Sequence, residues 1–202
     1  MDLRQAGVTD ARLLSAVEGV PRGRFVPLQH ADAAYAGVPL PLDCGQTLPP
    51  ALVTAQIVAA ADVRSQHSVL DIGTGSGYQA ALLARLARKV HSVERYAGLA
   101  RAAGQRLQAL GVANVIVHHA DGRAGLNGQG LFDRIVSDSA FPTVPRFLLE
   151  HLVSGGSVVC PIGGPGEVHK VARFAKVGSR FERTDLFDGR FGFLQPGVAT
   201  AL

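Results

Sequence analysis

The clearest pattern in the chain is an alternation, beginning at Ser68, of short apolar runs with longer segments that repeat apolar residues every three or four positions. Such short runs are typical of buried strands, and the longer segments are typical of amphipathic helices. The pattern predicts strands over 68–72, 90–94, 114–118, 132–137 and 156–160, and helices over 77–88, 96–110 and 144–152. Two later runs, 168–175 and 180–187, are joined by a short glycine-containing connection that favours antiparallel pairing. We therefore expect an α/β fold: a mostly parallel seven-stranded sheet with an antiparallel edge and helices on both faces.

The first 67 residues follow a different pattern. Leu13, Leu14 and Val17 share one face of a helix predicted over 10–18, and a long proline-containing stretch then continues to Pro50. That stretch is too apolar to be disordered, and long irregular segments inside compact domains are usually functional. We expect residues 1–67 to form a lid or substrate wall that packs on a domain formed by residues 68–202.

The most informative motif is the glycine-rich segment that follows the predicted strand 68–72. Gly73, Gly75 and Gly77, with Thr74 and Ser76 between them, leave the backbone open to a ligand at the start of a helix. A dinucleotide fingerprint needs a third glycine where Tyr78 stands. Asp71, just before the turn, suits a cationic ligand better than a pyrophosphate. The motif therefore favours S-adenosyl-L-methionine as the cofactor, with a nicotinamide enzyme as the weaker alternative.

Acidic residues also mark the ends of the next two predicted strands. Glu94 lies 21 positions after Gly73, where a carboxylate can bind ribose hydroxyls, and Asp121-Gly122 could accept a hydrogen bond from an adenine amino group. Taken singly, Glu94 could be a helix cap, Asp121-Gly122 a simple turn, and Tyr78 either pocket lining or packing at the helix start. Taken together, they predict a cofactor site that consists of Asp71, Gly73, Thr74, Gly75, Ser76, Gly77, Tyr78, Glu94, Asp121 and Gly122.

Composition narrows the class of protein. The chain has 202 residues, 47% of them apolar, and a net charge of +4 from arginines that are scattered rather than clustered with aromatics, which argues against nucleic acid as a partner. No apolar run reaches the roughly 18 residues that cross a bilayer, and the first residues do not resemble a signal peptide. We expect a cytoplasmic protein with reduced thiols at Cys44 and Cys160. His118 and His119 are adjacent on a strand and face opposite ways, so no metal site is expected.

With these residues assembled, the chain resembles the protein-L-isoaspartate O-methyltransferase family of Rossmann-like class I methyltransferases. The resemblance rests on residues 69–80, Pro39-Leu-Pro41 with Gly45-Gln46-Thr47, Phe132–Val136 with Pro142-Thr-Val-Pro145, and Val159–Gly163. It implies S-adenosyl-L-methionine as methyl donor and the carboxyl group of isoaspartyl residues in damaged proteins or peptides as acceptor. It also implies that Gln46 and Thr47 pack over the cofactor near the transferred methyl group.

Three departures from the family pattern concern the methyl acceptor. Pro49 stands where the family has a serine, so a hydroxyl is lost, and Gly37 replaces an aspartate. Asp138 lies in a segment whose residues are uncharged in the family. If Asp138 were ionised beside the methyl group, it would repel a carboxylate 4 Å away by about 1–4 kcal/mol. Asp138 could instead orient or deprotonate an amine or hydroxyl, or cap the following turn.

We take Thr47 and Asp138 as the candidate catalytic residues. The departures leave two alternatives open: a methyltransferase for another protein group or small molecule, and a non-catalytic homologue that binds the cofactor. An RNA methyltransferase is a weaker alternative, since it should show a basic patch.

Overall fold

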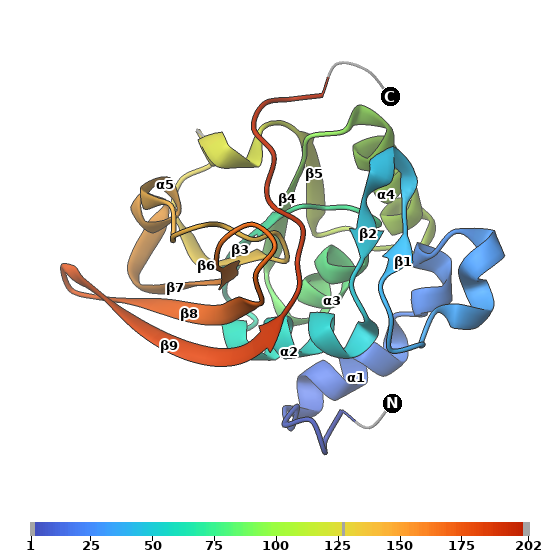
Figure 1. The fold of residues 1–202 in the computed structure, drawn as a ribbon, viewed down its shortest axis with the longest axis horizontal. Coiled ribbons are helices and arrows are strands. Elements are labelled where there is room, and N and C mark those ends of the chain that lie inside the picture. Colours follow the sequence, from blue (N-terminus) through green and yellow to red (C-terminus); the bar gives the residue numbers. More distant parts are fainter. Residues whose placement is uncertain (1–2, 127, 200–202) are drawn as a thin grey trace.

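The computed structural model describes residues 3–126 and 128–199, whose centre is a seven-stranded sheet (Figure 1). Along the sheet the strands run β5 (Val115–His119), β4 (Lys89–Glu94), β3 (Ser68–Ile72), β6 (Phe132–Ser137), β7 (Leu152–Ile162), β8 (His169–Val177) and β9 (Arg180–Gly189). The first five are parallel, and β8 and β9 are antiparallel to their neighbours. The predicted mixed α/β sheet with an antiparallel edge is confirmed.

Helices cover both faces of the sheet. On one face α1 (Ala11–Gly19), α2 (Ala51–Ala61) and α3 (Tyr78–Leu86) enclose the larger apolar cluster, and α4 (Ala97–Ala109) packs on β4 and β5. On the other face α5 (Arg146–Glu150) contributes to a second cluster, around Phe132 and Leu148. The N-terminal 67 residues thus contribute two helices to the main core.

The prediction missed α2 altogether and set several boundaries differently. Six of the eleven residues of α2 are buried, so the helix lacks the polar face that would have marked its period. Strand β7 is longer than predicted because Leu152 already pairs with Phe132, and α5 is correspondingly shorter. The stretch expected to be irregular contains a small antiparallel pair, β1 (Leu40–Pro41) and β2 (Thr47–Leu48).

The chain after β9 returns across the carboxyl ends of the parallel strands (Figure 1). Ala140 donates to the Gly192 carbonyl at 2.7 Å, and Ala199 donates to the Arg95 carbonyl at 2.9 Å. Residues 190–199, which we call the C-terminal strap, therefore lie over the edge where ligands of open α/β sheets bind.

Candidate active site

The glycine turn between β3 and α3 is held in a conformation that side chains with a Cβ rarely adopt. Gly73, Gly75 and Gly77 have φ values of +95°, +52° and +91°. The N–H groups of Gly73 and Thr74 donate to the Val93 carbonyl at 3.0 and 3.1 Å, which ties the turn to the end of β4. The turn thus presents bare backbone to the space above the sheet.

Asp71 supports this turn from below and does not line the space above it. Its carboxyl is fully buried and accepts hydrogen bonds from Gln79 Nε2 at 2.8 Å and Ser92 Oγ at 2.7 Å. The Ser92 hydroxyl is also bonded to Thr74 Oγ1 at 2.6 Å, so Asp71 links β3, β4, the turn and α3. Burial raises the pKa of Asp71 to about 6, against the effect of its two donors.

Glu94 is at the open end of β4 with its carboxylate beside the turn. Its Oε2 accepts from the Gly75 N–H at 2.8 Å and its Oε1 accepts from the Tyr96 N–H at 3.0 Å. Each carboxylate oxygen can accept a second bond, so Glu94 is fixed in place while it can still bind hydroxyl groups.

Asp121 and Gly122 lie at the end of β5 beside the C-terminal strap. The two oxygens of Asp121 accept from the N–H groups of Arg123 and Gly197, both at 2.8 Å. Gly122 lines a small recess together with Glu94 and Tyr96, and a Cβ there would come within 2.8 Å of the Ile72 side chain. Glycine at this position lets the end of β5 pack closely against Ile72.

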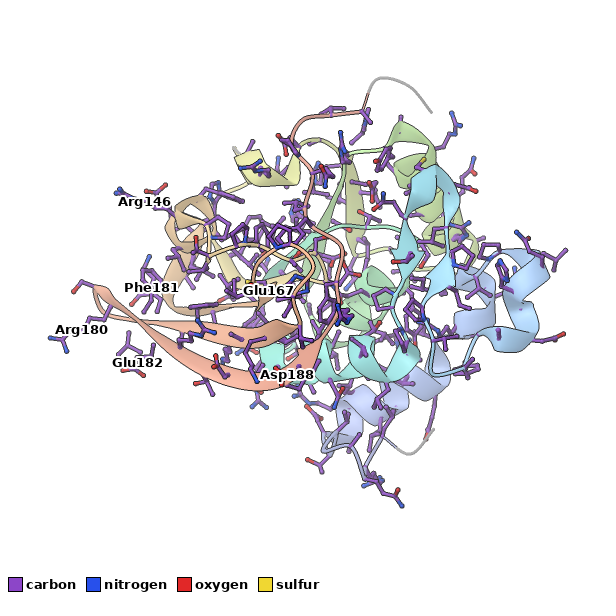
Figure 2. The ribbon with its side chains drawn as sticks, in the orientation of Figure 1. Arg146, Glu167, Arg180, Phe181, Glu182 and Asp188 are labelled. Carbon is purple, nitrogen blue, oxygen red and sulfur yellow. The ribbon has the colours of Figure 1, made fainter. Side chains whose placement is uncertain are left out.

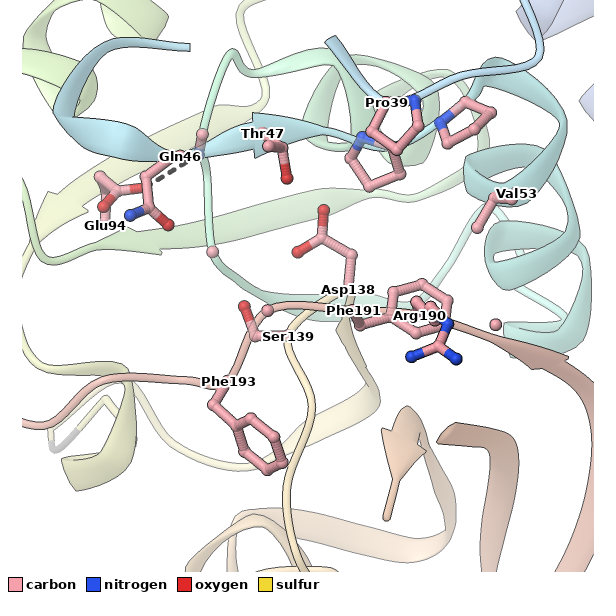
Figure 3. Close-up of a pocket in the computed structure, with 16 residues that line it drawn as sticks. Pro39, Gln46, Thr47, Val53, Glu94, Asp138, Ser139, Arg190, Phe191 and Phe193 are labelled. Atoms are coloured by element: carbon pink, nitrogen blue, oxygen red, sulfur yellow. Dashed lines mark hydrogen bonds between the residues drawn. The ribbon is translucent and has the colours of Figure 1, made fainter. Parts of the chain in front are cut away.

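The turn and Glu94 open into a cavity of about 390 Å³ (Figure 3). One wall is the β1–β2 segment, including Gln46 and Thr47, and a second wall is formed by the end of β6 with Asp138 and Ser139. The structure therefore brings Gln46, Thr47, Gly73, Gly75, Glu94 and Asp138 to one cavity, and the stretch ending at Pro50 is one of its walls.

Asp138 projects into this cavity, and Figure 3 shows its carboxyl pointing across toward the Thr47 hydroxyl. Its Oδ1 is 3.2 Å from where a Cβ on Gly73 would stand, so the carboxyl lies directly over the turn. Burial, with the negative charges of Asp71 and Glu94 nearby, raises the pKa of Asp138 to about 8. No bond from Asp138 caps the following turn among the described residues; Ser137 Oγ accepts from the Ser139 N–H there.

Tyr78 belongs to the core, so of the two interpretations left open for it the structure favours packing at the helix start. Its ring stands edge-on to Phe25 with centroids 5.5 Å apart, beneath the buried guanidinium of Arg22 at 4.7 Å. Arg22 donates to the carbonyls of Ala34 and Pro49 at 2.6 and 2.5 Å. This arginine thus fastens the cavity wall at Pro49 to the first turn of α3.

No pattern in the sequence predicts the third wall of the cavity, which is formed by Gly189 and the start of the C-terminal strap. Gly189, Arg190, Phe191, Gly192 and Phe193 all line the cavity. The Phe191 N–H donates to His169 Nδ1 at 3.2 Å, which holds the strap against β8. These residues follow no strand of the parallel set and precede no predicted helix, so only the return of the chain places them here.

Comparison with known proteins decides the family. A sequence profile described as protein-L-isoaspartate(D-aspartate) O-methyltransferase (PCMT) matches residues 1–192. The chain belongs to this family. It is 45% identical over 202 residues to the protein-L-isoaspartate O-methyltransferase of Maricaulis maris, covering 100% of this chain and 94% of that protein. The corresponding protein of Azorhizobium caulinodans is 44% identical, with 100% and 93% covered.

The fold of the protein-L-isoaspartate O-methyltransferase family is also the fold observed here. A Plasmodium falciparum structure described as a protein of this family in complex with S-adenosyl-L-homocysteine superposes with a TM-score of 0.81 at 20% identity, covering 96% of this chain and 94% of that one. Within residues 3–126 and 128–199, no helix is long and apolar enough to cross a membrane. In the same ranges no group of three His, Cys, Asp or Glu side chains is placed to hold a metal ion.

Proposed function

We propose that this protein transfers a methyl group from S-adenosyl-L-methionine to the free carboxyl group of isoaspartyl residues in damaged proteins. The observation that carries the proposal, in a chain of this family, is that the glycine turn, Glu94 and the Thr47–Asp138 pair share one cavity. The cofactor residues and the acceptor wall are thus on opposite sides of a space that a methyl group could cross.

The residues present fit this cofactor. The bare backbone at Gly73 and Gly75 leaves room for a ligand, and Glu94 can accept bonds from ribose hydroxyls. The carboxyl groups of Asp71, beneath the turn, and Glu94, beside it, make a setting that suits a ligand with a sulfonium and an ammonium group. When bound, S-adenosyl-L-methionine supplies a methyl group already activated by the positive sulfur.

The chain's own contribution is binding, alignment and exclusion of water. A carboxylate oxygen attacks with its own lone pair, so no general base is required and the rate depends mainly on orientation. We assign orientation of the acceptor to the Thr47 and Ser139 hydroxyls and to Arg190. In the described lining of the cavity, Arg190 is the only Lys, Arg or His, and it donates one bond to the Gly166 carbonyl at 3.2 Å.

The test is transfer of labelled methyl from S-adenosyl-L-methionine to an isoaspartyl peptide, with the same peptide containing normal aspartate as control. We expect base-labile ester on the isoaspartyl peptide only. Confirmed binding of S-adenosyl-L-homocysteine without ester would contradict the proposal and leave a methyltransferase fold with another acceptor or none.

A further inference from the structure

The proposed function creates a charge conflict at Asp138. The acceptor is an anion, yet Asp138 projects into the acceptor side of the cavity and no other described residue donates a hydrogen bond to its carboxyl. Two further carboxyl groups, Asp71 on β3 and Glu94 on β4, lie close enough for their negative charges to act on Asp138. An ionised Asp138 would add a third negative charge where the substrate carboxylate must enter.

The cavity also has few groups that could bind a carboxylate. Pro49 and Pro50 have no N–H, the Gly75 N–H is bonded to Glu94, and the Phe191 N–H is bonded to His169. The remaining side-chain donors on the described walls are few: the Gln46 amide, the Thr47 and Ser139 hydroxyls, and the Arg190 guanidinium. A protonated Asp138 would add a donor in the middle of this set.

We propose that Asp138 carries a proton when the isoaspartyl carboxylate binds and donates its O–H to that carboxylate. Acid–carboxylate bonds of this kind are short and strong, because the acceptor is fully charged. Asp138 then recognises the substrate as a donor, in a cavity where Pro49 offers no hydroxyl. This inference rests on the proposed function.

The surroundings of Asp138 favour the protonated state. Burial and the charges of Asp71 and Glu94 hold its pKa at about 8, so the acid form predominates at pH 7. Of the other groups on this cavity, Arg190 is the one described cation and lies after β9; Thr47 from β2 and Ser139 are uncharged. The cofactor sulfonium and the substrate carboxylate bring opposite charges, whose effects on Asp138 oppose one another.

Peptide binding is coupled to protonation of Asp138, so peptide affinity should depend on pH in one direction. Well below pH 8 Asp138 is already protonated, so peptide binding takes up almost no proton. Above pH 8 Asp138 is mostly ionised in the free protein and must take up a proton to bind a carboxylate. Peptide affinity should therefore be constant at lower pH and fall as pH rises through about 8.

The experiment measures proton uptake when an isoaspartyl peptide, acetylated and amidated at its ends, binds the protein saturated with S-adenosyl-L-homocysteine. Calorimetry in two buffers of different ionisation enthalpy at pH 8.5 should show uptake of roughly half a proton or more per peptide. At pH 6.5 the uptake should be near zero. Asp138→Asn, which keeps an N–H donor and cannot titrate, should show none at either pH and bind with pH-independent affinity.

Asp138→Ala, which lacks a donor, should bind the peptide about tenfold more weakly than wild type at pH 6.5, the loss expected for one charge-assisted hydrogen bond. Urea midpoints of both variants report whether they fold. Wild type without uptake at pH 8.5, equal uptake in Asp138→Asn, or wild-type affinity in Asp138→Ala would each overturn the inference while ester formation stands. Failure of wild type to esterify the peptide would instead overturn the proposed function.

Discussion

The two sides of the cavity are constructed in different ways. The cofactor side is one continuous strand–turn–helix unit, β3 to α3, which hydrogen bonds of Asp71 and Thr74 with Ser92 join to the neighbouring strand β4. The acceptor side is assembled from three separated segments: the β1–β2 wall, the end of β6, and the C-terminal strap. A site for an invariant cofactor can be encoded locally, whereas a site for a varied protein substrate depends on tertiary assembly.

Two of the chain's three departures from the family pattern lie on the acceptor side. Pro49 and Asp138 line the acceptor walls, while Gly73, Gly75 and Glu94 on the other side keep the expected types. Substitutions on the cofactor side should abolish binding of S-adenosyl-L-homocysteine. Substitutions on the acceptor side should alter only the affinity for the isoaspartyl peptide. Substitutions on each side test this separation.

The largest expected effect is on the cofactor side, at Gly75. Its φ of +52° disfavours any residue with a branched Cβ, and its N–H holds Glu94, so Gly75→Val should distort both at once. We expect affinity for S-adenosyl-L-homocysteine, measured by calorimetry, to fall at least about 100-fold, or roughly 2.7 kcal/mol. Gly104→Val in α4 is the matched control, because a Cβ there meets nothing within 4 Å. Unchanged affinity in Gly75→Val would refute the assignment of the turn.

Replacing Arg22 should destabilise both sides of the cavity, because Arg22 joins the wall at Pro49 to Tyr78 at the start of α3. Arg22→Met removes the bonds to the Ala34 and Pro49 carbonyls and leaves these oxygens without their donor. We expect a loss of about 2–4 kcal/mol in the free energy of unfolding, from urea titration. Arg24→Met is the control: Arg24 lies in the same 3₁₀ helix, Arg22–Phe25, but is exposed, so its loss should change stability little. A loss below about 1 kcal/mol would show that these bonds do not hold the wall in place.

The same contrast explains what the sequence could and could not predict. Strand 68–72 was predicted with its observed bounds because an apolar run and a glycine turn mark its two ends locally. Helix α2 was missed because it is apolar on nearly every side, and periodicity needs a polar face. Arg190 and Phe193 could not be placed, because their position depends on how the chain returns over the sheet. Asp138 was predicted to face the cavity, but its shifted pKa depends on Asp71 and Glu94, which are distant in sequence.

Arg190 should give an effect confined to the acceptor side. Arg190→Gln removes the one described cation of the cavity, so KM for an isoaspartyl peptide should rise about fivefold, the loss of roughly 1 kcal/mol that is the upper end for an exposed ion pair. Affinity for S-adenosyl-L-homocysteine should not change. Arg180→Gln is the control, because Arg180 lies at the far tip of the β8–β9 hairpin (Figure 2). An equal KM in wild type and Arg190→Gln would remove Arg190 from substrate binding.

The smallest expected effect is a gain, at Pro49. Pro49→Ser would return to the cavity wall the hydroxyl that the family pattern has there, while the backbone carbonyl that binds Arg22 is kept. One added hydrogen bond at this wall should contribute about 0.5–1 kcal/mol, so kcat/KM for the isoaspartyl peptide should rise two- to fivefold. Stability should fall slightly, since the unfolded chain gains freedom when proline is lost.

Pro50→Ser is the matched control for Pro49→Ser. Pro50 is the N-cap of α2, where a serine hydroxyl would bond the helix N–H groups and not the substrate. If Pro50→Ser raised kcat/KM as much as Pro49→Ser, the gain would come from loosening the wall, and the acceptor side would be limited by rigidity and not by its shortage of donors.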